Sequence, residues 1–131
     1  MMKHSRPLIR GLKKRVRSFG FAGHGVWLLV RTQIHFRIHL TAATVVCMLG
    51  AYLNITRVEW IALVVVIGAV LIAEGFNTAL EFLTDLVSPD YHELAKRSKD
   101  VAAGAVLLAA LMALAVGFLI FAPYLLTAES G

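Results

Sequence analysis

The amino-acid sequence predicts an all-α membrane protein in which an N-terminal amphipathic surface helix precedes three transmembrane helices. Hydrophobic residues make up 59% of the 131 residues, and charged residues make up only 16%. Soluble domains average about 45–50% apolar and about 25% charged residues, so this composition does not suit a water-soluble fold. The apolar residues also gather in long runs separated by short polar segments. At this length we expect a single domain, residues 1–131.

The basic charge of the chain is compatible with nucleic-acid binding and with contact to a membrane surface. The formal net charge is +5, which suits either partner. Most of the 13 Lys and Arg residues precede the first apolar run, as in membrane proteins with a cytoplasmic N-terminus. The sequence has no zinc-ligand spacing and no aromatic RNA-binding signature, so we expect no nucleic-acid partner. The single cysteine, Cys47, lies in an apolar run, where a core-filling role is expected.

Residues 7–30 are expected to form a basic helix that lies on the membrane surface. Apolar residues recur there at helical spacing, while Lys and Arg occupy the other faces. The apolar positions are Leu8, Leu12, Val16 and Phe19, and the basic positions are Arg10, Lys13, Lys14 and Arg17. Such a helix suits an anionic leaflet, although a partner-binding or soluble surface helix would show the same pattern. Three glycines, Gly20, Gly23 and Gly25, are expected to bend or loosen the chain before residues 26–30.

Three apolar segments follow, at about residues 38–53, 58–86 and 101–126. The first is short for a bilayer of about 30 Å, which needs about 20 residues. A tight turn is expected at residues 54–57, and Pro89 is expected to end the helix of the second segment. The charged residues 93–100 are expected to belong to the loop before the third segment. The third segment is rich in Ala and Gly, which suits close helix packing.

The distribution of Lys and Arg also predicts the orientation of the chain. Only Arg57 lies between the first two spans, whereas Lys96, Arg97 and Lys99 lie between the second and third. Cytoplasmic loops carry the excess of positive charge in membrane proteins. We therefore expect a multi-pass protein with a cytoplasmic N-terminus and a C-terminus on the outside.

Five polar residues form a stripe along the second span. They are Glu74, Asn77, Thr78, Glu81 and Asp85. At about 100° per residue they fall within an arc of about 100°. The opposite side is apolar and carries Leu71, Ile72, Leu80, Phe82 and Leu83. Because ionisable residues in a span are costly and usually face an interior or a cavity, the stripe predicts a functional site. A snorkelling helix end and an ion or proton pathway are the alternatives.

More chemically active residues follow the second span, namely Asp90, Tyr91, His92, Lys99 and Asp100. Phosphoryl transfer from a nucleotide needs carboxylates for Mg²⁺, a cation for the phosphate oxygens and a base near the acceptor hydroxyl. The chain offers all three kinds of group in one cluster at the membrane edge. It lacks the Gly-rich phosphate loop of soluble kinases.

The residues of this cluster resemble a known family. The stretch AEGFNTALEFLTDLVSPDYHELAKRSKDVAAGAVLLAA resembles the small bacterial integral membrane diacylglycerol kinases and their relatives, the undecaprenol kinases. The shared pattern is Glu-x-x-Asn-(Ser/Thr)-Ala-x-Glu-x-x-x-Asp, then Tyr-His, then Lys-Asp before a Gly/Ala-rich span. The segment RTQIHFRIHL is similar to the family's entry into its first span, and the likeness extends from about Lys13 onwards.

The resemblance implies a homotrimer in the bacterial inner membrane, with active sites shared between protomers. ATP and Mg²⁺ would enter from the cytoplasm and the lipid substrate from the bilayer. By position, Glu74 matches the family's catalytic base and Glu81 a metal-binding glutamate. The nucleotide-binding positions are Asn77, Asp90, Tyr91, His92, Lys99 and Asp100, while Thr78 and Asp85 complete the site.

Three positions depart from the family pattern. Lys14 stands where the family often has Arg, and Phe21 stands where it often has Tyr; both positions are implied to contact the nucleotide. Gln33 stands in place of a second metal-binding glutamate. Its neutral carbonyl oxygen is a weaker Mg²⁺ ligand than a carboxylate, so reduced metal affinity is expected, with altered activity as a further outcome. The alternative is that Gln33 forms a hydrogen bond to the nucleotide.

The sequence therefore favours a lipid kinase that transfers the ATP γ-phosphate to a lipid hydroxyl. The alternative is a non-catalytic small membrane oligomer that conducts protons or cations through the carboxylate stripe. The Tyr-His and Lys-Asp pairs favour the kinase, because a conductor has no evident need of them. Both diacylglycerol and undecaprenol remain open as substrates, although Pro89 and the Ala-Ala-Gly-Ala run are slightly closer to the undecaprenol branch.

Overall fold

The computed structural model describes residues 7–128, with side chains for Arg15 and for residues 17–126. Within that range it contains four α-helices and no strand. They are α1 (Pro7–Thr32), α2 (Ile34–Tyr52), α3 (Arg57–Val87) and α4 (Glu93–Ala128). The helices α2, α3 and α4 are long and apolar enough to cross a membrane, which confirms the predicted all-helical class with three candidate spans. The chain divides into two compact units, one ending at Gln33 and one beginning at Ile34, and each is described by itself.

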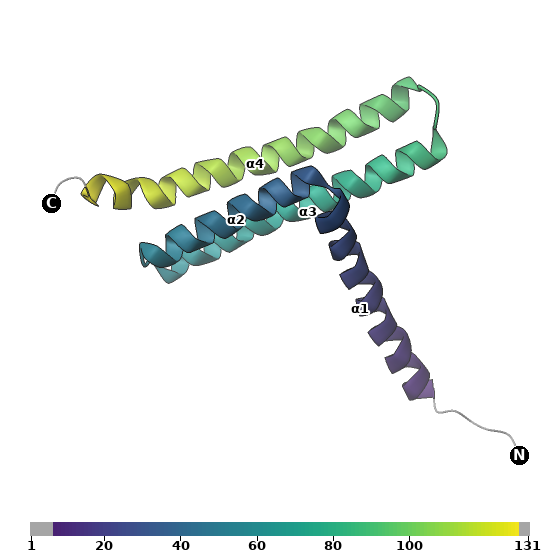
Figure 1. The fold of residues 1–131 in the computed structure, drawn as a ribbon, viewed down its shortest axis with the longest axis horizontal. Helices are drawn as coiled ribbons and strands as arrows, with labels where there is room; N and C mark the ends of the chain where they lie inside the picture. Colours follow the sequence, from purple (N-terminus) through teal and green to yellow (C-terminus); the bar gives the residue numbers. More distant parts are fainter. Residues whose placement is uncertain (1–6, 129–131) are drawn as a thin grey trace, which may run out of the picture. The chain divides into compact units, whose positions relative to one another are not determined.

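The first unit contains α1, which is continuous over 26 residues. The predicted bend is wrong, because the helix runs through all three glycines (Figure 1). A Gly in a helix interior costs about 1 kcal/mol relative to Ala. Breaking the helix would instead leave unpaired backbone groups, and these cost more wherever water is scarce. The continuous hydrogen-bond ladder therefore outweighs the conformational preference of glycine.

The last turns of α1 carry a small aromatic and basic group. His24 stacks on Trp27 with their ring centroids 5.4 Å apart. The Arg31 guanidinium lies 5.0 Å from the centroid of the Trp27 ring. Trp and Arg combine an apolar body with a polar tip, which suits a membrane–water interface.

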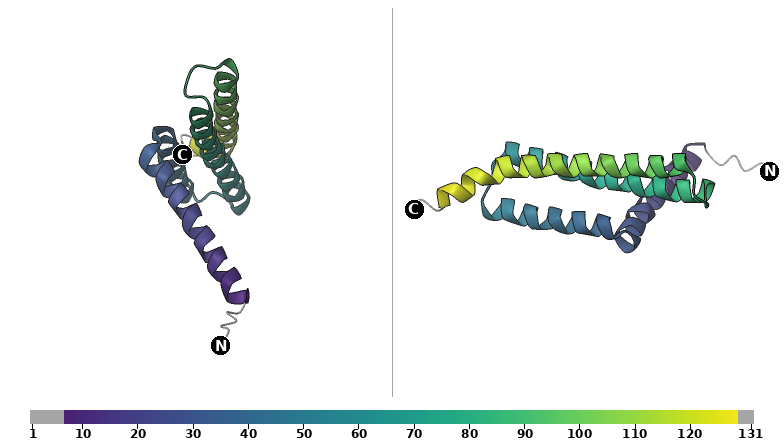
Figure 2. Two further views of the ribbon diagram at one scale, coloured as in Figure 1. Left: turned by 90° about the vertical axis from the view of Figure 1, so that its right-hand side faces the viewer. Right: turned by 90° about the horizontal axis from the view of Figure 1, so that it is seen from above.

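The second unit is an up-down-up bundle in which α3 packs against both α2 and α4 (Figures 1 and 2). The 19 residues of α2 span about 28 Å, close to the hydrocarbon thickness of about 30 Å. The 31 residues of α3 span about 46 Å, so α3 is longer than that layer. Together with α4 it continues past the beginning of α2 towards the turn at residues 88–92 (Figure 1).

The polar and apolar faces of α3 are arranged opposite to those of a soluble helix. The side chains of Glu74, Asn77 and Thr78 are buried, whereas Ile72 and Phe82 are at least half exposed. Lipid tails solvate apolar side chains, so an outward apolar face is stable in a bilayer. The predicted stripe therefore faces the interior of the bundle at its buried end.

The turn between α2 and α3 is fixed by hydrogen bonds. Asn54 adopts a φ of 52°, a left-handed conformation that Asn tolerates. Thr56 and Glu59 form a capping box, in which the Thr56 N–H donates to Glu59 Oε2 at 2.7 Å. The Tyr124 hydroxyl of α4 donates to the same oxygen at 2.8 Å. The Tyr124–Glu59 hydrogen bond joins the end of α4 to the beginning of α3. It was not predicted from the sequence.

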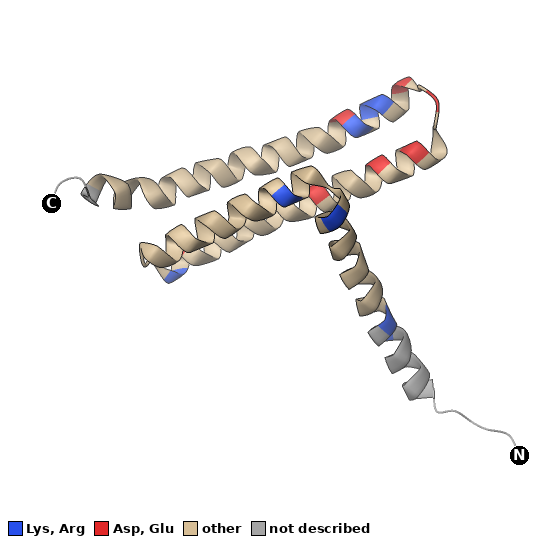
Figure 3. Cartoon of the chain, in the orientation of Figure 1, with Lys and Arg blue, Asp and Glu red and all other residues tan. Residues whose placement is uncertain are grey.

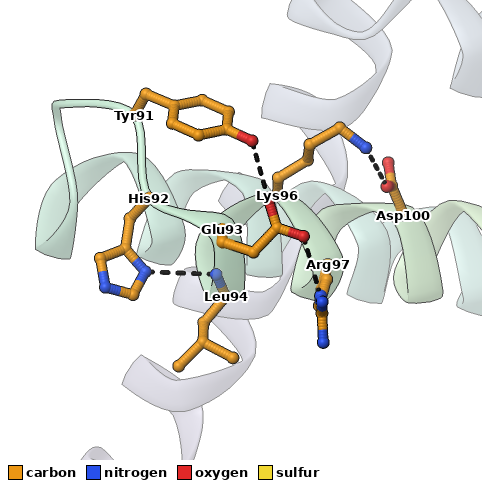
Figure 4. Close-up of polar contacts among 7 residues, drawn as sticks. All are labelled: Tyr91, His92, Glu93, Leu94, Lys96, Arg97 and Asp100. Atoms are coloured by element: carbon orange, nitrogen blue, oxygen red, sulfur yellow. Dashed lines mark hydrogen bonds and ion pairs between the residues drawn. The ribbon is translucent and has the colours of Figure 1, made fainter.

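The prediction of a charged loop before the third span is wrong, because α4 begins at Glu93. The charges are arranged as helical i,i+4 pairs, which stabilise the first turns of α4. Lys96 Nζ lies 2.7 Å from Asp100 Oδ2, and Arg97 Nε lies 3.0 Å from Glu93 Oε1 (Figure 4). The third apolar segment therefore continues a helix that begins well outside it.

Candidate active site

The middle of α3 contains a buried polar segment made of Glu74, Asn77 and Thr78. Their side chains are 4%, 8% and 2% exposed, respectively. Asn77 Nδ2 donates to Glu81 Oε1 at 3.0 Å, because residues four positions apart lie on one helix face. The Glu74 carboxylate makes no hydrogen bond or ion pair within the described part of the chain. A buried, unpaired carboxylate is costly, and such groups concentrate at functional sites.

Two further polar atoms of this segment lack partners among residues 7–128. They are the Asn77 Oδ1 and Thr78 Oγ1 atoms. Other helix threonines behave differently, since the hydroxyls of Thr41, Thr44 and Thr84 each donate to the carbonyl four residues earlier. The Thr78 hydroxyl is buried without that bond. It is therefore available to a group that the described chain does not supply.

A second, open part of the site lies at the turn between α3 and α4. The structure has a cavity of about 320 Å³ there. Charged residues occur on the α3 end, in the turn and on the first turns of α4 (Figure 3). The charged and aromatic residues that line it are Asp85, Asp90, Tyr91, His92, Lys96, Lys99 and Asp100. Six of these were predicted from the sequence, and Lys96 was missed. Its signal was its position four residues before Asp100 on one helix face.

The two lysines of the cavity are both paired with carboxylates. Lys99 Nζ lies 2.5 Å from Asp85 Oδ1, which joins α4 to the end of α3. Lys96 Nζ lies 2.7 Å from Asp100 Oδ2 within α4. Asp90 adds a third carboxylate to the lining. The cavity is therefore lined by three carboxylates and two ammonium groups, a donor set that suits a metal-complexed phosphate.

Tyr91 and His92 present hydrogen-bond donors in the turn (Figure 4). The Tyr91 hydroxyl donates to Glu93 Oε2 at 2.9 Å. This bond, followed by partial desolvation and the charge of Asp100, raises the pKa of Tyr91, so the phenol stays neutral at physiological pH. His92 Nδ1 accepts from the Leu94 N–H at 3.2 Å, so the proton of a neutral imidazole is on Nε2, which is free to donate.

The polar stripe connects the buried segment with the cavity. Glu81 is half-buried and lies between Asn77, to which it is hydrogen-bonded, and Asp85, which lines the cavity. Glu74 and Asp85 are eleven positions apart, about 16 Å along the helix. The structure therefore brings together the predicted residues of α3, the turn and α4 along one path.

The remaining predicted residues belong to the unit that contains α1. The side chain of Lys14 lies outside the described residues. Phe21 is 69% exposed on α1. Gln33 lies between α1 and α2, and its Nε2 donates to Thr32 Oγ1 at 3.1 Å. These residues and Glu81 belong to different units of the chain. The predicted roles of Lys14, Phe21 and Gln33 therefore stay predictions.

The carboxylates of the site suit Mg²⁺ only if the substrate supplies part of the coordination. Among the described residues no group of three His, Cys, Asp or Glu side chains is placed to hold a metal ion. Mg²⁺ usually keeps several waters and is bound by one or two carboxylates together with substrate phosphates. Glu81 meets this requirement, because Asn77 occupies only its Oε1 atom. The residues therefore fit a metal ion that arrives with the nucleotide.

Comparison with known proteins agrees with these features. The family described as prokaryotic diacylglycerol kinase matches residues 20–121. The undecaprenol kinase of Bacillus subtilis is 39% identical over 114 residues, which cover 87% of this chain and 93% of that protein. The diacylglycerol kinase of Synechocystis is 43% identical over 111 residues, 84% of this chain and 63% of that longer protein. The diacylglycerol kinase of Escherichia coli K12 is 26% identical over 103 residues, 79% of this chain and 84% of that protein.

These matches cover α2, α3, most of α4 and the second part of α1. The sequence left two hypotheses, a lipid kinase and a conductor of protons or cations, and these matches support the lipid kinase. A kinase of this family uses ATP, and its three long apolar helices make it a multi-pass membrane protein. The chain therefore belongs to the prokaryotic diacylglycerol kinase family and is a membrane lipid kinase, a diacylglycerol or an undecaprenol kinase.

Proposed function

We propose that this lipid kinase uses Glu74 as the general base that accepts the proton of the lipid hydroxyl. Two observations carry this proposal: Glu74 is only 4% exposed, and its carboxylate has no hydrogen-bond or ion-pair partner in the described part of the chain. A lipid hydroxyl is a poor nucleophile until its proton has an acceptor. As the new O–P bond forms, the O–H proton passes to Glu74, the bond between the γ-phosphorus and its bridging oxygen breaks, and ADP leaves.

The nucleotide would bind at the turn between α3 and α4. Lys99 and Lys96 provide cations for the phosphate oxygens, and His92 provides an Nε2–H donor. Tyr91 offers an aromatic face beside them. The remaining proposed nucleotide contacts are Asn77, Asp90, Asp100, Lys14 and Phe21. Positioning of the phosphates would supply most of the rate increase, because phosphoryl transfer needs little covalent help from the protein.

Glu81 is the proposed Mg²⁺ ligand of the chain, and Gln33 its proposed companion. The bound ion would neutralise charge on the phosphate oxygens. The Asn77 amide orients the Glu81 carboxylate through its 3.0 Å hydrogen bond. Because Gln33 supplies a neutral oxygen, we expect this chain to need more Mg²⁺ than a relative with two glutamates.

The proposed assembly is a homotrimer with shared active sites, formed by one domain of residues 1–131. Two features support it. Large apolar side chains on α2, α3 and α4 remain exposed in the single chain, so lipids or neighbouring copies must cover them. Thr78 Oγ1 and Asn77 Oδ1 are buried without partners among the described residues, so a group from a neighbouring copy would satisfy them. The proposed orientation places the N-terminus and the turn at residues 88–92 in the cytoplasm of a bacterial inner membrane.

The proposal is tested with purified protein in bicelles, Mg²⁺ and labelled ATP. Diacylglycerol and undecaprenol are supplied in separate reactions, because the relatives include kinases named for each lipid. We expect label transfer to at least one of them, and the preferred lipid identifies the branch. Absence of transfer to any hydroxyl lipid by a folded, ATP-binding protein would overturn the proposal.

A further inference from the structure

Lys99 reaches the cavity at the α3–α4 turn with a partner already in place. Its ammonium group is 2.5 Å from Asp85 Oδ1, and the pair joins residues 14 positions apart. The side chains are 38% exposed for Lys99 and 65% exposed for Asp85. Asp85 is the more exposed partner, so its carboxylate can rotate into water while the lysine stays at the cavity wall.

The charges around the cavity oppose a simple electrostatic attraction of ATP. Three carboxylates, Asp85, Asp90 and Asp100, face two ammonium groups. Each ammonium group is neutralised by its own carboxylate at 2.5 or 2.7 Å. A polyphosphate that approaches Lys99 would come close to the Asp85 carboxylate, and like charges at such distances repel. The Asp85 carboxylate must therefore move away from Lys99 if the polyphosphate is to bind there.

We propose that Asp85 is a positioning residue that holds Lys99 at the cavity wall until the nucleotide binds, after which Lys99 exchanges this carboxylate for a phosphate oxygen of ATP. The proposal rests on the nucleotide site described under the proposed function. The exchange makes and breaks no covalent bond, and Lys99 remains an ammonium ion throughout. Asp85 then turns to water, at low cost because it is already mostly exposed.

This exchange also favours polyphosphates over small anions. Inorganic phosphate must displace Asp85 with a single contact to Lys99. A nucleotide brings several phosphate groups, which contact Lys99 and Lys96 together and share the cost of displacing the carboxylates. The ion pair therefore lowers the affinity of the cavity for anions that contact Lys99 alone.

The test measures kcat and the KM for Mg-ATP at a fixed lipid concentration, using the full-length protein in bicelles. Asp85→Asn removes the competing charge and keeps the side-chain size. We expect it to lower KM by about two- to fivefold, the range for one exposed ion pair. Asp85→Glu restores a carboxylate and should keep KM near that of the unmodified protein.

Lys99→Gln is the second part of the test. We expect it to raise KM, and we expect Asp85→Asn to give no decrease when it is added to Lys99→Gln. The matched control is Glu93→Gln, which also removes a carboxylate from an ion pair of α4. Glu93 does not line the cavity, and the new amide oxygen can still accept from Tyr91. KM should stay within twofold in this control.

Several results would overturn the exchange. An increase or no change of KM in Asp85→Asn would mean that Asp85 either supports bound nucleotide or has no effect on it. An equal decrease in Glu93→Gln would assign the gain to net charge alone. The nucleotide site itself is tested separately, because an unchanged KM in Lys99→Gln would contradict that site, whereas a raised KM without the Asp85→Asn decrease would contradict only the exchange.

Discussion

The buried segment of α3 and the open cavity at the α3–α4 turn are chemically opposite halves of one site. Glu74, Asn77 and Thr78 are almost fully buried, and three of their polar atoms or groups lack partners in the described chain. In the cavity, each of the two lysines is paired and at least a third exposed. In the proposed mechanism the buried Glu74 takes part in the reaction step, whereas the exposed, paired lysines contact the nucleotide. Substitutions in the two halves should therefore change different kinetic constants.

The largest expected effect is on kcat in the buried half. Glu74→Gln is nearly isosteric but cannot accept the hydroxyl proton as a carboxylate does. Loss of a general base costs about 10²- to 10⁴-fold in rate. The measurement is steady-state phosphorylation of the preferred lipid, with helix content as the control for folding. A decrease of less than tenfold would mean that another group, such as Asp100, is the base.

Glu81→Ala tests the point where the two halves meet. Removing this carboxylate should abolish the proposed protein ligand for Mg²⁺ while leaving the helix intact. We expect the Mg²⁺ concentration for half-maximal activity to rise by about 10- to 100-fold. A titration of activity with Mg²⁺ at saturating ATP checks this. An unchanged Mg²⁺ requirement would remove Glu81 from the metal site.

Gln33→Glu should have a smaller effect of opposite sign. It supplies a second carboxylate in addition to that of Glu81, and a carboxylate binds Mg²⁺ better than an amide oxygen does. We expect activity at limiting Mg²⁺ to rise about two- to fivefold, in proportion to one exposed charge contact. Activity at saturating Mg²⁺ should be unchanged. A large loss of turnover in a folded variant would give Gln33 a different role.

The smallest expected effect concerns the stability of the buried half. Thr78→Val removes a buried hydroxyl that has no partner in the described chain and keeps the side-chain shape. We expect the free energy of unfolding of the assembled protein to decrease by about 1 kcal/mol, because the hydrogen bond to the proposed partner from outside the chain is lost. Thermal unfolding of the purified protein, compared with Thr84→Val, measures the difference. Unchanged stability of Thr78→Val would contradict a partner for the hydroxyl in the assembled protein.

Much of the buried half could be predicted from the sequence. The spacing of Glu74, Asn77, Thr78, Glu81 and Asp85 depends only on the helical period, so their common face followed directly. The Lys99–Asp85 pair could not be predicted in this way, because that contact depends on how α4 is rotated against α3. The Tyr124–Glu59 hydrogen bond, which joins residues 65 positions apart, could not be predicted either.

Two local predictions failed because one rule outweighed another. Glycines predicted a bend in α1, but backbone hydrogen bonding kept the helix continuous. Charges predicted a loop after Pro89, but their i,i+4 spacing stabilises a helix from Glu93. The spacing was visible in the sequence, so this second failure could have been avoided.

The central claim is that the buried segment determines kcat whereas the cavity determines the KM for Mg-ATP, and one paired measurement tests it directly. The values of kcat and of KM for Mg-ATP are measured for Glu74→Gln and Lys99→Gln in the same bicelles and with the same lipid. We predict that Glu74→Gln lowers kcat by at least a hundredfold with KM nearly unchanged, and that Lys99→Gln mainly raises KM. If Glu74→Gln instead raised KM while its kcat stayed within tenfold, the buried half would be a binding site and the account would be wrong.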